Sequence, residues 1–191
     1  SLDGWNEAVI ARTIAAAIPN ETALFVSSSR PIRDLEGFAL PRTGVDTYAN
    51  RGLAGIDGNI STALGIAYAH KATIAILGDL SFLYDLTGLI NKEAINCRFI
   101  VINNDGGGIF STLPQRGSHG FETVFGTPHG LNPAEIAKAM GVSAQQISSL
   151  KELEAAVKAP VTGISVVVCD VPDRESNADN LKAIYDSLNS M

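Results

Sequence analysis

The sequence predicts an α/β fold, with a doubly wound, mostly parallel six-stranded sheet and helices on both faces. Three observations lead to this prediction. Helical and strand-like patterns alternate along the chain. Several of the strand candidates are continuous apolar runs, which is typical of parallel strands buried on both faces. The chain has 191 residues, of which 46% are hydrophobic and 18% charged, so it can bury one sizeable core.

The first third of the chain contains two predicted helices. An amphipathic pattern favours a helix at 5–18, which Pro19 ends, and a small-residue pattern favours another at 61–70 that can lie close to the sheet. Between them, the stretch 31–44 is irregular or carries one short helix. Two short strands are also expected here, at 23–29 and 45–50.

The middle of the chain contains the two clearest strands. The runs 73–78 and 98–103 are apolar throughout, which indicates strands inside a parallel sheet. Leucines between them recur at helical spacing, so we expect a helix at 82–95. The stretch 111–131 is rich in glycine and is long for a plain connection, which is typical of functional or disordered loops.

The last third continues the alternation. A helix is predicted after Asn132, a good capping residue, with Pro133 at its first position. A second helix, at 149–159, begins with a capping serine. The remaining expected elements are strands at 144–147 and 163–171 and a final helix at 177–191.

Charge and composition exclude several kinds of protein. The net charge of −6 and the lack of a Lys/Arg block argue against a nucleic-acid surface. No apolar stretch reaches the roughly 20 residues that span a bilayer, and the start of the chain reads as an amphipathic helix, not a signal peptide. We therefore expect no membrane span and a cytoplasmic protein. Cys97 and Cys169 sit in apolar runs without metal-site spacing, which favours buried reduced thiols over a disulfide.

Polar residues stand at four predicted strand ends. In a doubly wound sheet, ligands bind at the carboxyl ends of the strands. Four polar ends that converge on one edge therefore indicate a binding site. They are Ser27-Ser28-Ser29, Asn50-Arg51-Gly52, Gly78-Asp79 and Asn103-Asn104-Asp105-Gly106.

Two of these ends suit a metal bound to a phosphate. A strand–helix–strand crossover brings Asp79 and Asn104 to one edge, and their oxygens, with a glycine carbonyl, suit Mg²⁺. The run of three glycines at 106–108 lets the backbone approach a ligand and present N–H groups to an anion. Each half alone also has a plain structural interpretation: Asp79 caps the next helix, and 103–108 forms a turn.

These residues carry a family resemblance. Gly78-Asp79-Leu80 followed by Asn103-Asn104 resembles the thiamine diphosphate fingerprint, a Gly-Asp-Gly and a later Asn pair, with leucine in place of the last glycine. Longer segments are similar to the 2-succinyl-5-enolpyruvyl-6-hydroxy-3-cyclohexene-1-carboxylate (SEPHCHC) synthases, the MenD family. They are SSSRPIRD (27–34), NRGLAGIDGNISTALG (50–65), GDLSFLYDL (78–86), NNDGGGIFSTLPQ (103–115) and FGTPHGL (125–131).

The resemblance implies a fold, a cofactor and a reaction. It covers the family's carboxy-terminal diphosphate-binding domain, so residues 1–191 are expected to form that single thiamine diphosphate-binding fold without the pyrimidine-binding and central domains. Family members use thiamine diphosphate and Mg²⁺ (or Mn²⁺) to decarboxylate 2-oxoglutarate and add the succinyl unit to isochorismate in menaquinone (vitamin K2) biosynthesis. The cofactor-activating glutamate lies in the pyrimidine-binding domain, which a neighbouring subunit of a homodimer or homotetramer supplies. The isolated chain is therefore expected to lack activity.

The resemblance also implies residue roles. Mg²⁺ is held by the side chains of Asp79 and Asn104 and by the carbonyl of Gly106. Arg33 and Arg51 face the dicarboxylate substrates, which suit the guanidinium fork, although a surface salt bridge is the plain alternative. Ile56 is the apolar wedge that bends the cofactor. The other residues expected to contact the cofactor are Ser28, Ser29, Leu80, Ser81, Gly108, Ile109 and Phe110.

Some alternatives stay open from the sequence. The chain could belong to another thiamine diphosphate carboligase or decarboxylase, such as an acetolactate synthase relative, although Leu80 and FGTPHGL speak against it. It could also be a binding domain without turnover. A nicotinamide-binding domain is remote, because GGGIF lacks the spacing of its glycine motif. His119 and His129 lie in the irregular stretch, where a solvated or hydrogen-bonded loop histidine is favoured over a general base.

Overall fold

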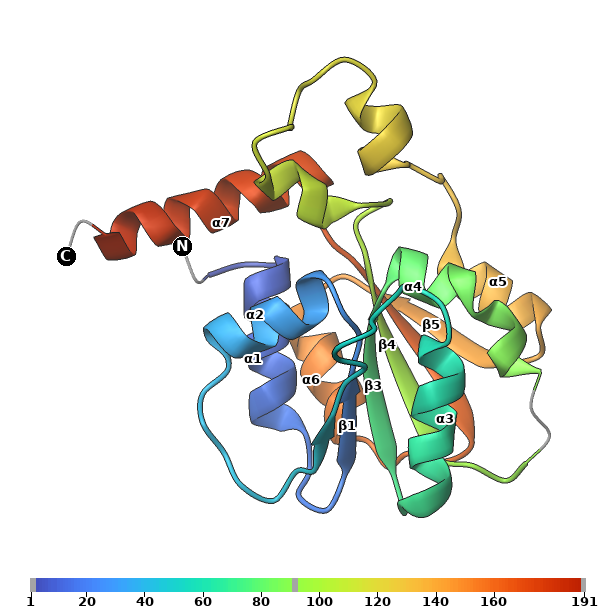
Figure 1. The fold of residues 1–191 in the computed structure, drawn as a ribbon. Helices are drawn as coiled ribbons and strands as arrows, with labels where there is room; N and C mark the ends of the chain where they lie inside the picture. Colours follow the sequence, from blue (N-terminus) through green and yellow to red (C-terminus); the bar gives the residue numbers. More distant parts are fainter. Residues whose placement is uncertain (1–2, 91–92, 190–191) are drawn as a thin grey trace.

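The computed structural model describes residues 3–90 and 93–189. Six strands form a sheet in the order β2-β1-β3-β4-β6-β5 (Figure 1). Every pairing between neighbouring strands is parallel, so the predicted α/β fold is confirmed and the sheet is parallel throughout. The strands are β1 (Ala23–Val26), β2 (Thr47–Tyr48), β3 (Thr73–Gly78), β4 (Cys97–Asn103), β5 (Ser143–Ile147) and β6 (Ile164–Asp170).

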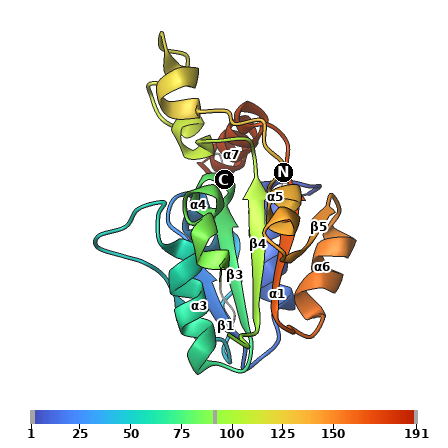
Figure 2. The same cartoon turned by 90° about the vertical axis from the view of Figure 1, so that its right-hand side faces the viewer.

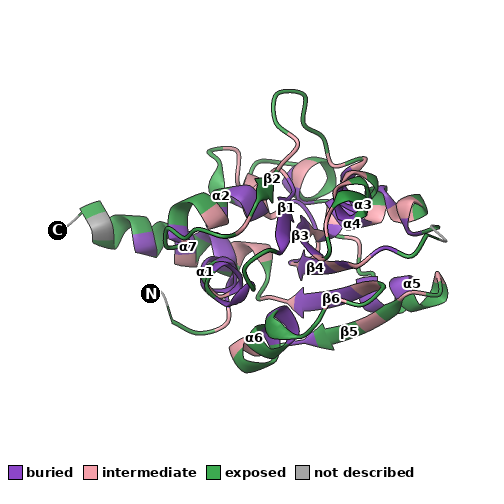
Figure 3. Ribbon diagram, turned by 90° about the horizontal axis from the view of Figure 1, so that it is seen from below, coloured by how far each residue is buried: buried purple, intermediate pink, exposed green. Residues whose placement is uncertain are grey.

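Helices cover both faces of this sheet. Viewed from below, α1, α2 and α6 lie on one face and α3, α4 and α5 on the other, as predicted (Figure 3). The seventh helix, α7, crosses near the carboxyl edge of the sheet (Figure 1). The helices are α1 (Glu7–Ala17), α2 (Arg30–Phe38), α3 (Asn59–Ala69), α4 (Asp79–Tyr84), α5 (Pro133–Ala139), α6 (Leu150–Lys158) and α7 (Arg174–Asn189).

The strand side chains alternate between two apolar cores. On β3, Ile74 and Ile76 pack toward α1 and α6, whereas Ala75 and Leu77 pack toward α3. The same alternation continues on β4, and these strand residues are almost completely buried. Burying one such side chain stabilises a fold by about 1.5–3 kcal/mol. The two cores therefore hold β3 and β4, the strands that lead to the candidate site, in a fixed register.

The helix expected at 82–95 differs from the prediction. It begins earlier, as α4, stops at Tyr84, and continues as one tight turn, Leu86–Leu89; residues 91–92 lie outside the described residues. Asp85 explains the break, because its carboxylate accepts hydrogen bonds from the N–H of Ser61 at 2.7 Å and from its hydroxyl at 3.2 Å. These bonds to α3 hold Asp85 where a continuous helix would not place it.

Other boundaries follow the sequence more closely. The capping residues act as expected: Asn132 accepts from two backbone N–H groups of α5, and Ser149 accepts from the N–H of Glu152 in α6. Of the two options for 31–44, a helix forms, as α2. The final helix begins at Arg174, three residues earlier than predicted, and residues 190–191 are outside the described part.

The long irregular stretch lies above the carboxyl edge of the sheet (Figures 1 and 2). It contains only two short helical turns, Gly108–Thr112 and Glu122–Gly126. Ion pairs connect it to α7: Arg116 pairs with Glu175 and Asp179, and Arg174 pairs with Glu122. The opposite, amino edge of the sheet carries short connections, such as the turn from α3 into β3 at Lys71.

Two further expectations concern the cysteines and the membrane. Cys97 and Cys169 are both free and buried, as predicted. Burial raises the pKa of the Cys97 thiol to about 12 and also raises the pKa of Cys169. Among the helices of the described residues, none combines the length and the apolar character needed to cross a bilayer.

Candidate functional site

Two adjacent strand ends meet at the carboxyl edge. The last residue of β3, Gly78, pairs in register with Ile102 of β4. Asp79 is the first residue after β3, and Asn104 is the first residue after β4. The two residues therefore lie at neighbouring strand ends. The N–H of Gly106 donates to Asp79 Oδ2 at 2.8 Å and ties the two ends together.

The Asp79 carboxylate is buried and well bonded. It is 2% exposed. Its Oδ1 accepts from the N–H of Leu80 at 2.7 Å, and its Oδ2 lies 3.2 Å from Nε2 of His129. Burial raises the pKa of Asp79, and the hydrogen bonds from Gly106, His129 and Leu80 partly oppose this. A cation beside this carboxylate would favour its charged form.

His129 holds the irregular stretch against Asp79. The N–H of Leu131 donates to His129 Nδ1 at 3.0 Å, so Nε2 carries the ring proton and donates to Asp79. Asp105 supports the same contact, because its Oδ1 accepts from the backbone N–H groups of His129 at 3.0 Å and Gly130 at 2.7 Å. These two backbone N–H groups also stabilise the negative charge of Asp105. His129 is thus a hydrogen-bonded loop histidine.

Within the described residues, the Asn104 side chain makes a hydrogen bond through its nitrogen, Nδ2, but not through its oxygen, Oδ1. Its Nδ2 donates to Oε1 of Glu7 at 2.6 Å. Its Oδ1 is buried and has no hydrogen-bond partner within the described part of the chain. A buried carbonyl oxygen without a partner costs about 1–3 kcal/mol. This oxygen is therefore a strong candidate for a ligand atom.

The three glycines at 106–108 are required by close packing. A Cβ on Gly106 would lie 2.1 Å from the carbonyl oxygen of Gly126, and one on Gly107 would lie 2.2 Å from that of Phe125. A Cβ on Gly108 would lie 2.3 Å from Asn104 Nδ2. Gly106 also has φ +131°, a conformation that favours glycine. No long helix begins here, because Gly108–Thr112 is a single turn.

These groups fit a hard divalent cation. The buried carboxylate of Asp79 and the unpartnered Oδ1 of Asn104 are oxygen donors, and Gly106 adds a carbonyl that accepts only the N–H of Gly108, at 3.0 Å, among the described residues. Mg²⁺ prefers such oxygens and takes the rest of its ligands from phosphate and water. The described residues contain no cluster of three His, Cys, Asp or Glu side chains suited to a metal, so this donor set depends on the amide and the carbonyl.

The expected phosphate and ring contacts lie around the same edge. Ser28 and Ser29 follow β1, and the Ser28 hydroxyl donates to the carbonyl of Asn50 at 3.2 Å. Leu80 and Ser81 follow Asp79 in α4, where Ser81 is buried. Ile109 and Phe110 are half-buried in the turn after the glycines, and the Phe110 ring packs against Phe125.

Arg51 and Ile56 are not brought into contact with Asp79. They lie on the loop between β2 and α3, which extends away from the sheet (Figure 2). Arg51 is exposed and Ile56 is half-buried. Within the described residues, Arg51 makes no ion pair, so the salt-bridge alternative finds no support.

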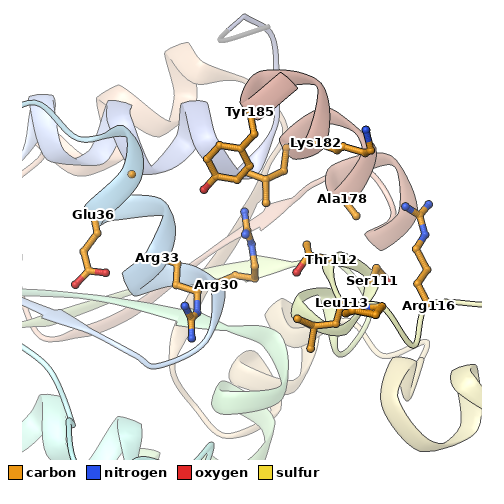
Figure 4. Close-up of a pocket in the computed structure, with 13 residues that line it drawn as sticks. Arg30, Arg33, Glu36, Ser111, Thr112, Leu113, Arg116, Ala178, Lys182 and Tyr185 are labelled. Atoms are coloured by element: carbon orange, nitrogen blue, oxygen red, sulfur yellow. The ribbon is translucent and has the colours of Figure 1, made fainter. Parts of the chain in front are cut away.

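Arg33 lines a cleft of about 850 Å³ between α2, the turn at 108–112 and α7 (Figure 4). Three other cations line the cleft, and each is paired: Arg30 with Glu7 and Asp34, Arg116 with two carboxylates of α7, and Lys182 with Asp186. Arg33 is exposed and makes no ion pair with any described residue. Its guanidinium is therefore available to an anion in the cleft.

Two site residues were not found from the sequence. Glu7 contacts Asn104, and His129 contacts Asp79, across long stretches of chain. A signal for Glu7 does exist, because it shares a helix face with Ile10 and Ile14, so a carboxylate stands on an apolar stripe. His129 lies in the segment FGTPHGL, which carries the family resemblance, but that segment does not indicate the contact with Asp79.

Comparison with known families identifies the class of protein as the thiamine diphosphate enzymes. Residues 37–171 match the family model described as "Thiamine pyrophosphate enzyme, C-terminal TPP binding domain". The chain belongs to this family, and its cofactor is thiamine diphosphate, with which the family typically uses Mg²⁺.

Curated relatives identify a particular family within this class. The chain is 42% identical over 160 residues to a "2-succinyl-5-enolpyruvyl-6-hydroxy-3-cyclohexene-1-carboxylate synthase" of Thermobifida fusca, covering 80% of this chain and 29% of that protein. It is 41% identical over 173 residues to the Staphylococcus aureus (strain JH9) protein of the same name, covering 88% and 30%. The predicted resemblance to the carboxy-terminal domain of the MenD family is confirmed. The chain spans less than a third of these relatives' length.

Solved structures agree with the fold. Benzoylformate decarboxylase from Polynucleobacter necessarius superposes with a TM-score of 0.69 at 19% identity, covering 86% of this chain and 33% of that one. A thiamine diphosphate-dependent 4-hydroxybenzoylformate decarboxylase from Rhodococcus jostii RHA1 gives 0.68 at 18% identity, covering 90% and 33%. At this identity the likeness shows the shared fold alone.

Proposed function

We propose that this chain is the cofactor-binding part of a SEPHCHC synthase. Such an enzyme decarboxylates 2-oxoglutarate and adds the succinyl unit to isochorismate in menaquinone biosynthesis. The observation that carries the proposal is the junction of Asp79 and Asn104 at two adjacent strand ends. The names of relatives at 41–42% identity support the specific reaction.

The carboxyl edge holds the diphosphate end of the cofactor through a cation. Mg²⁺ binds to the carboxylate of Asp79, to Oδ1 of Asn104 and to the carbonyl of Gly106, and Mn²⁺ is the alternative ion. Ser28, Ser29, Ser81 and the backbone of Gly108 bind the diphosphate. The cation offsets the negative charge of the diphosphate, which this acidic chain does not do with a block of its own lysines or arginines.

Apolar side chains hold the rings. Ile56 supports the bent cofactor, and Leu80, Ile109 and Phe110 form the wall beside it. Thiamine diphosphate, when bound, supplies the nucleophilic carbon that reacts with a 2-oxo acid. The residues of this chain orient it and exclude water from the reacting atoms.

Two arginines recognise the substrates. Both 2-oxoglutarate and isochorismate are dicarboxylates, and a guanidinium binds a carboxylate through two parallel hydrogen bonds. Arg33 and Arg51 are exposed and make no ion pair with a described residue, which supports this role.

The complete site also needs a pyrimidine-binding domain. We propose that a neighbouring subunit of a cytoplasmic homodimer or homotetramer supplies it, together with the activating glutamate. Leu53 in the extended loop is fully exposed, at 101%, as expected for a residue that such a domain covers. By itself the chain binds the cofactor but does not turn over substrate.

Calorimetry tests the binding part of this proposal. Titration of thiamine diphosphate into the 191-residue chain is expected to show binding that requires Mg²⁺ and is lost in Asp79→Ala. Asp46→Ala, which removes an exposed carboxylate at the amino end of β2, opposite the carboxyl edge, is the matched control and should bind normally. Binding without Mg²⁺ dependence, or binding unaffected by Asp79→Ala, would contradict the proposed site.

A chimera tests the reaction. The chain replaces the corresponding carboxy-terminal part of the Thermobifida fusca relative, and CO₂ release from 2-oxoglutarate is measured. Arg33→Ala and Arg51→Ala should each raise KM for a substrate about tenfold or more, from loss of a charged hydrogen-bond pair. Arg12→Ala, an exposed arginine on α1, is the control. Release of CO₂ by the isolated chain would contradict the proposal that the chain needs a further domain for turnover. A chimera that acts only on other 2-oxo acids would contradict the proposal that 2-oxoglutarate is the substrate.

A further inference from the structure

The Asn104 amide has two orientations that fill the same space. Rotation by half a turn exchanges its oxygen, Oδ1, with its nitrogen, Nδ2. Only one orientation presents an oxygen to a cation. The other presents an NH₂ group, which cannot bind a metal ion. Something in the fold has to select between them.

Glu7 makes this selection. Its Oε1 lies 2.6 Å from Asn104 Nδ2, and both side chains are buried, at 5% and 8% exposure. A carboxylate only accepts hydrogen bonds, so the NH₂ group of Asn104 must face it. The opposite orientation would place two oxygens in contact in a buried site. Oδ1 is therefore left on the other side, unpartnered within the described residues.

Hydrogen bonds with two other helices fix the position of Glu7. Its Oε2 accepts from Nε of Arg30 at 3.2 Å, and Arg30 also pairs with Asp34. Its backbone lies in the first turn of α1, where its N–H donates to Oδ1 of Asn177 in α7 at 3.4 Å. The position of the carboxylate is thus fixed by three helices, and it can hold Asn104 without moving.

We propose that Glu7 is a positioning residue for the cation site, which sets the Asn104 amide so that its oxygen faces the metal ion. Glu7 does not touch the ion or the cofactor, and it acts only through Asn104. The inference rests on the proposed function, because it concerns how the proposed magnesium ligand is oriented.

The substitution Glu7→Gln tests the orientation. Arg30 only donates, so the oxygen of the substituted side chain would face Arg30 and its NH₂ group would face Asn104. Asn104 would then turn its own oxygen toward that new NH₂ group and its own NH₂ group toward the cation. The size of the side chain is unchanged, so the result is an inverted amide and not a cavity.

Asp34→Asn is the matched control. It changes the other carboxylate on Arg30 to an amide and leaves the contact between Glu7 and Asn104 intact. Both variants change one carboxyl group of the same Arg30 network to an amide of equal size. A general effect of the Arg30 network on Mg²⁺ binding would therefore appear in both variants. A change in the orientation of the Asn104 amide would appear only in Glu7→Gln.

The experiment measures Mg²⁺ affinity by calorimetry in the presence of thiamine diphosphate, and the Asn104 side-chain amide by ¹H–¹⁵N NMR without ligands. We expect Glu7→Gln to weaken Mg²⁺ binding about tenfold or more, as for residues that orient metal ligands, and to shift the Asn104 NH₂ resonances. Asp34→Asn should stay within about twofold, the usual scatter of such comparisons.

Each outcome is decisive. If the unsubstituted chain binds and Glu7→Gln binds equally well, or if Asp34→Asn weakens binding as much, the inference is overturned while the proposed function stands. If Glu7→Gln leaves the Asn104 resonances unchanged, the inference is overturned as well. If the unsubstituted chain binds no Mg²⁺ with the cofactor, the proposed function fails and the inference fails with it.

Discussion

At the scale of single residues, the candidate site depends on close packing around the side chain of Asn104. Gly108 shows this, because the Asn104 amide occupies the space in which a Cβ of residue 108 would lie. The same Nδ2 donates to Glu7, which in turn accepts a hydrogen bond from Arg30. The Asn104 amide, whose Oδ1 is the proposed metal ligand, is therefore packed against a glycine and a carboxylate, and a guanidinium holds that carboxylate.

Gly108→Ala should disturb Asn104 directly. The added methyl group would have to displace Asn104 Nδ2, so we expect a loss of about 1–3 kcal/mol in the free energy of unfolding and weaker Mg²⁺ binding. Denaturant unfolding and calorimetry measure the two effects. Gly65→Ala is the control, because Gly65 lies inside α3 and an added Cβ would meet no described atom within 4 Å outside the adjacent backbone of its own helix. Equal stability of Gly108→Ala and the parent chain would contradict the packing argument.

Asp34 gives the chain a pH-dependent stability. Burial raises its pKa from 3.8 to about 7, the Arg30 charge opposes this, and the Glu7 charge adds to it. Because the pKa is raised in the folded state, protonation of Asp34 stabilises the fold. That stabilisation is fully present below about pH 4 and is lost as the pH rises through about 7.

Between pH 8 and pH 5, the free energy of unfolding should therefore rise by about 1–3 kcal/mol through Asp34. Denaturant unfolding at both pH values measures it, and the rise should be smaller by this amount in Asp34→Asn. Asp46→Asn, which changes an exposed carboxylate, should behave like the parent chain. An identical pH dependence in Asp34→Asn would show that Asp34 is not the responsible group.

At the scale of elements, α7 and the irregular stretch stabilise each other. Arg116 reaches from the stretch to Glu175 and Asp179, and Arg174 reaches back from α7 to Glu122. The backbone hydrogen bonds within this stretch join residues only three to five positions apart, so the ion pairs with α7 add contacts to a distant part of the chain. His129 and Asp105 fix its far end beside Asp79.

Arg116→Ala should loosen this stretch without unfolding the domain. Exposed ion pairs contribute only about 0.2–1 kcal/mol, so we expect faster amide hydrogen exchange at 111–126 with a change in unfolding free energy below about 1 kcal/mol. Lys182→Ala is the control, because Lys182 pairs with Asp186 inside α7. Unchanged exchange at 111–126 would mean that the ion pairs do not order it.

Strand and cap residues make much of the fold predictable. The limits of β3 match the predicted run 73–78, because an unbroken series of β-branched and apolar residues has few alternatives. The caps at Asn132 and Ser149 also act as predicted. The helix predicted at 82–95 is too long, because Asp85 bonds to α3, a contact that no local pattern encodes.

The site is predictable in part for the same reason. Asp79 and Asn104 follow apolar strands, and a parallel sheet must bring such ends to one edge. The contacts of Glu7 and His129 depend on how α1 and the irregular stretch pack over that edge. Those contacts join residues 97 and 50 positions apart, so they follow from tertiary packing and not from sequence spacing.

At the scale of the whole molecule, the two cores on either side of the sheet enclose both thiols. Cys97 lies at the start of β4, opposite Ile164, whereas Cys169 lies opposite Ile102 near the strand's other end. The two sulfur atoms are therefore too far apart to form a disulfide. Both remain thiols with raised pKa values inside the cores.

Thiol reactivity should consequently report global unfolding. In the folded chain at about pH 8, neither cysteine should react with an aromatic disulfide reagent such as Ellman's reagent, because the reactive thiolate is disfavoured and inaccessible. In denaturant both should react, at the same midpoint as the loss of circular dichroism. Cys97→Ala and Cys169→Ala assign the two reactions. Fast reaction of either thiol in the native chain would indicate local opening of the sheet.

The turn at Lys71 lies at the end of the sheet opposite the carboxyl edge, and Lys71 is exposed. A biotin or a fluorophore joined to a cysteine at this position would leave every strand end in the candidate site untouched. Such a handle would fix the chain to a sensor surface with its binding edge turned toward the solution.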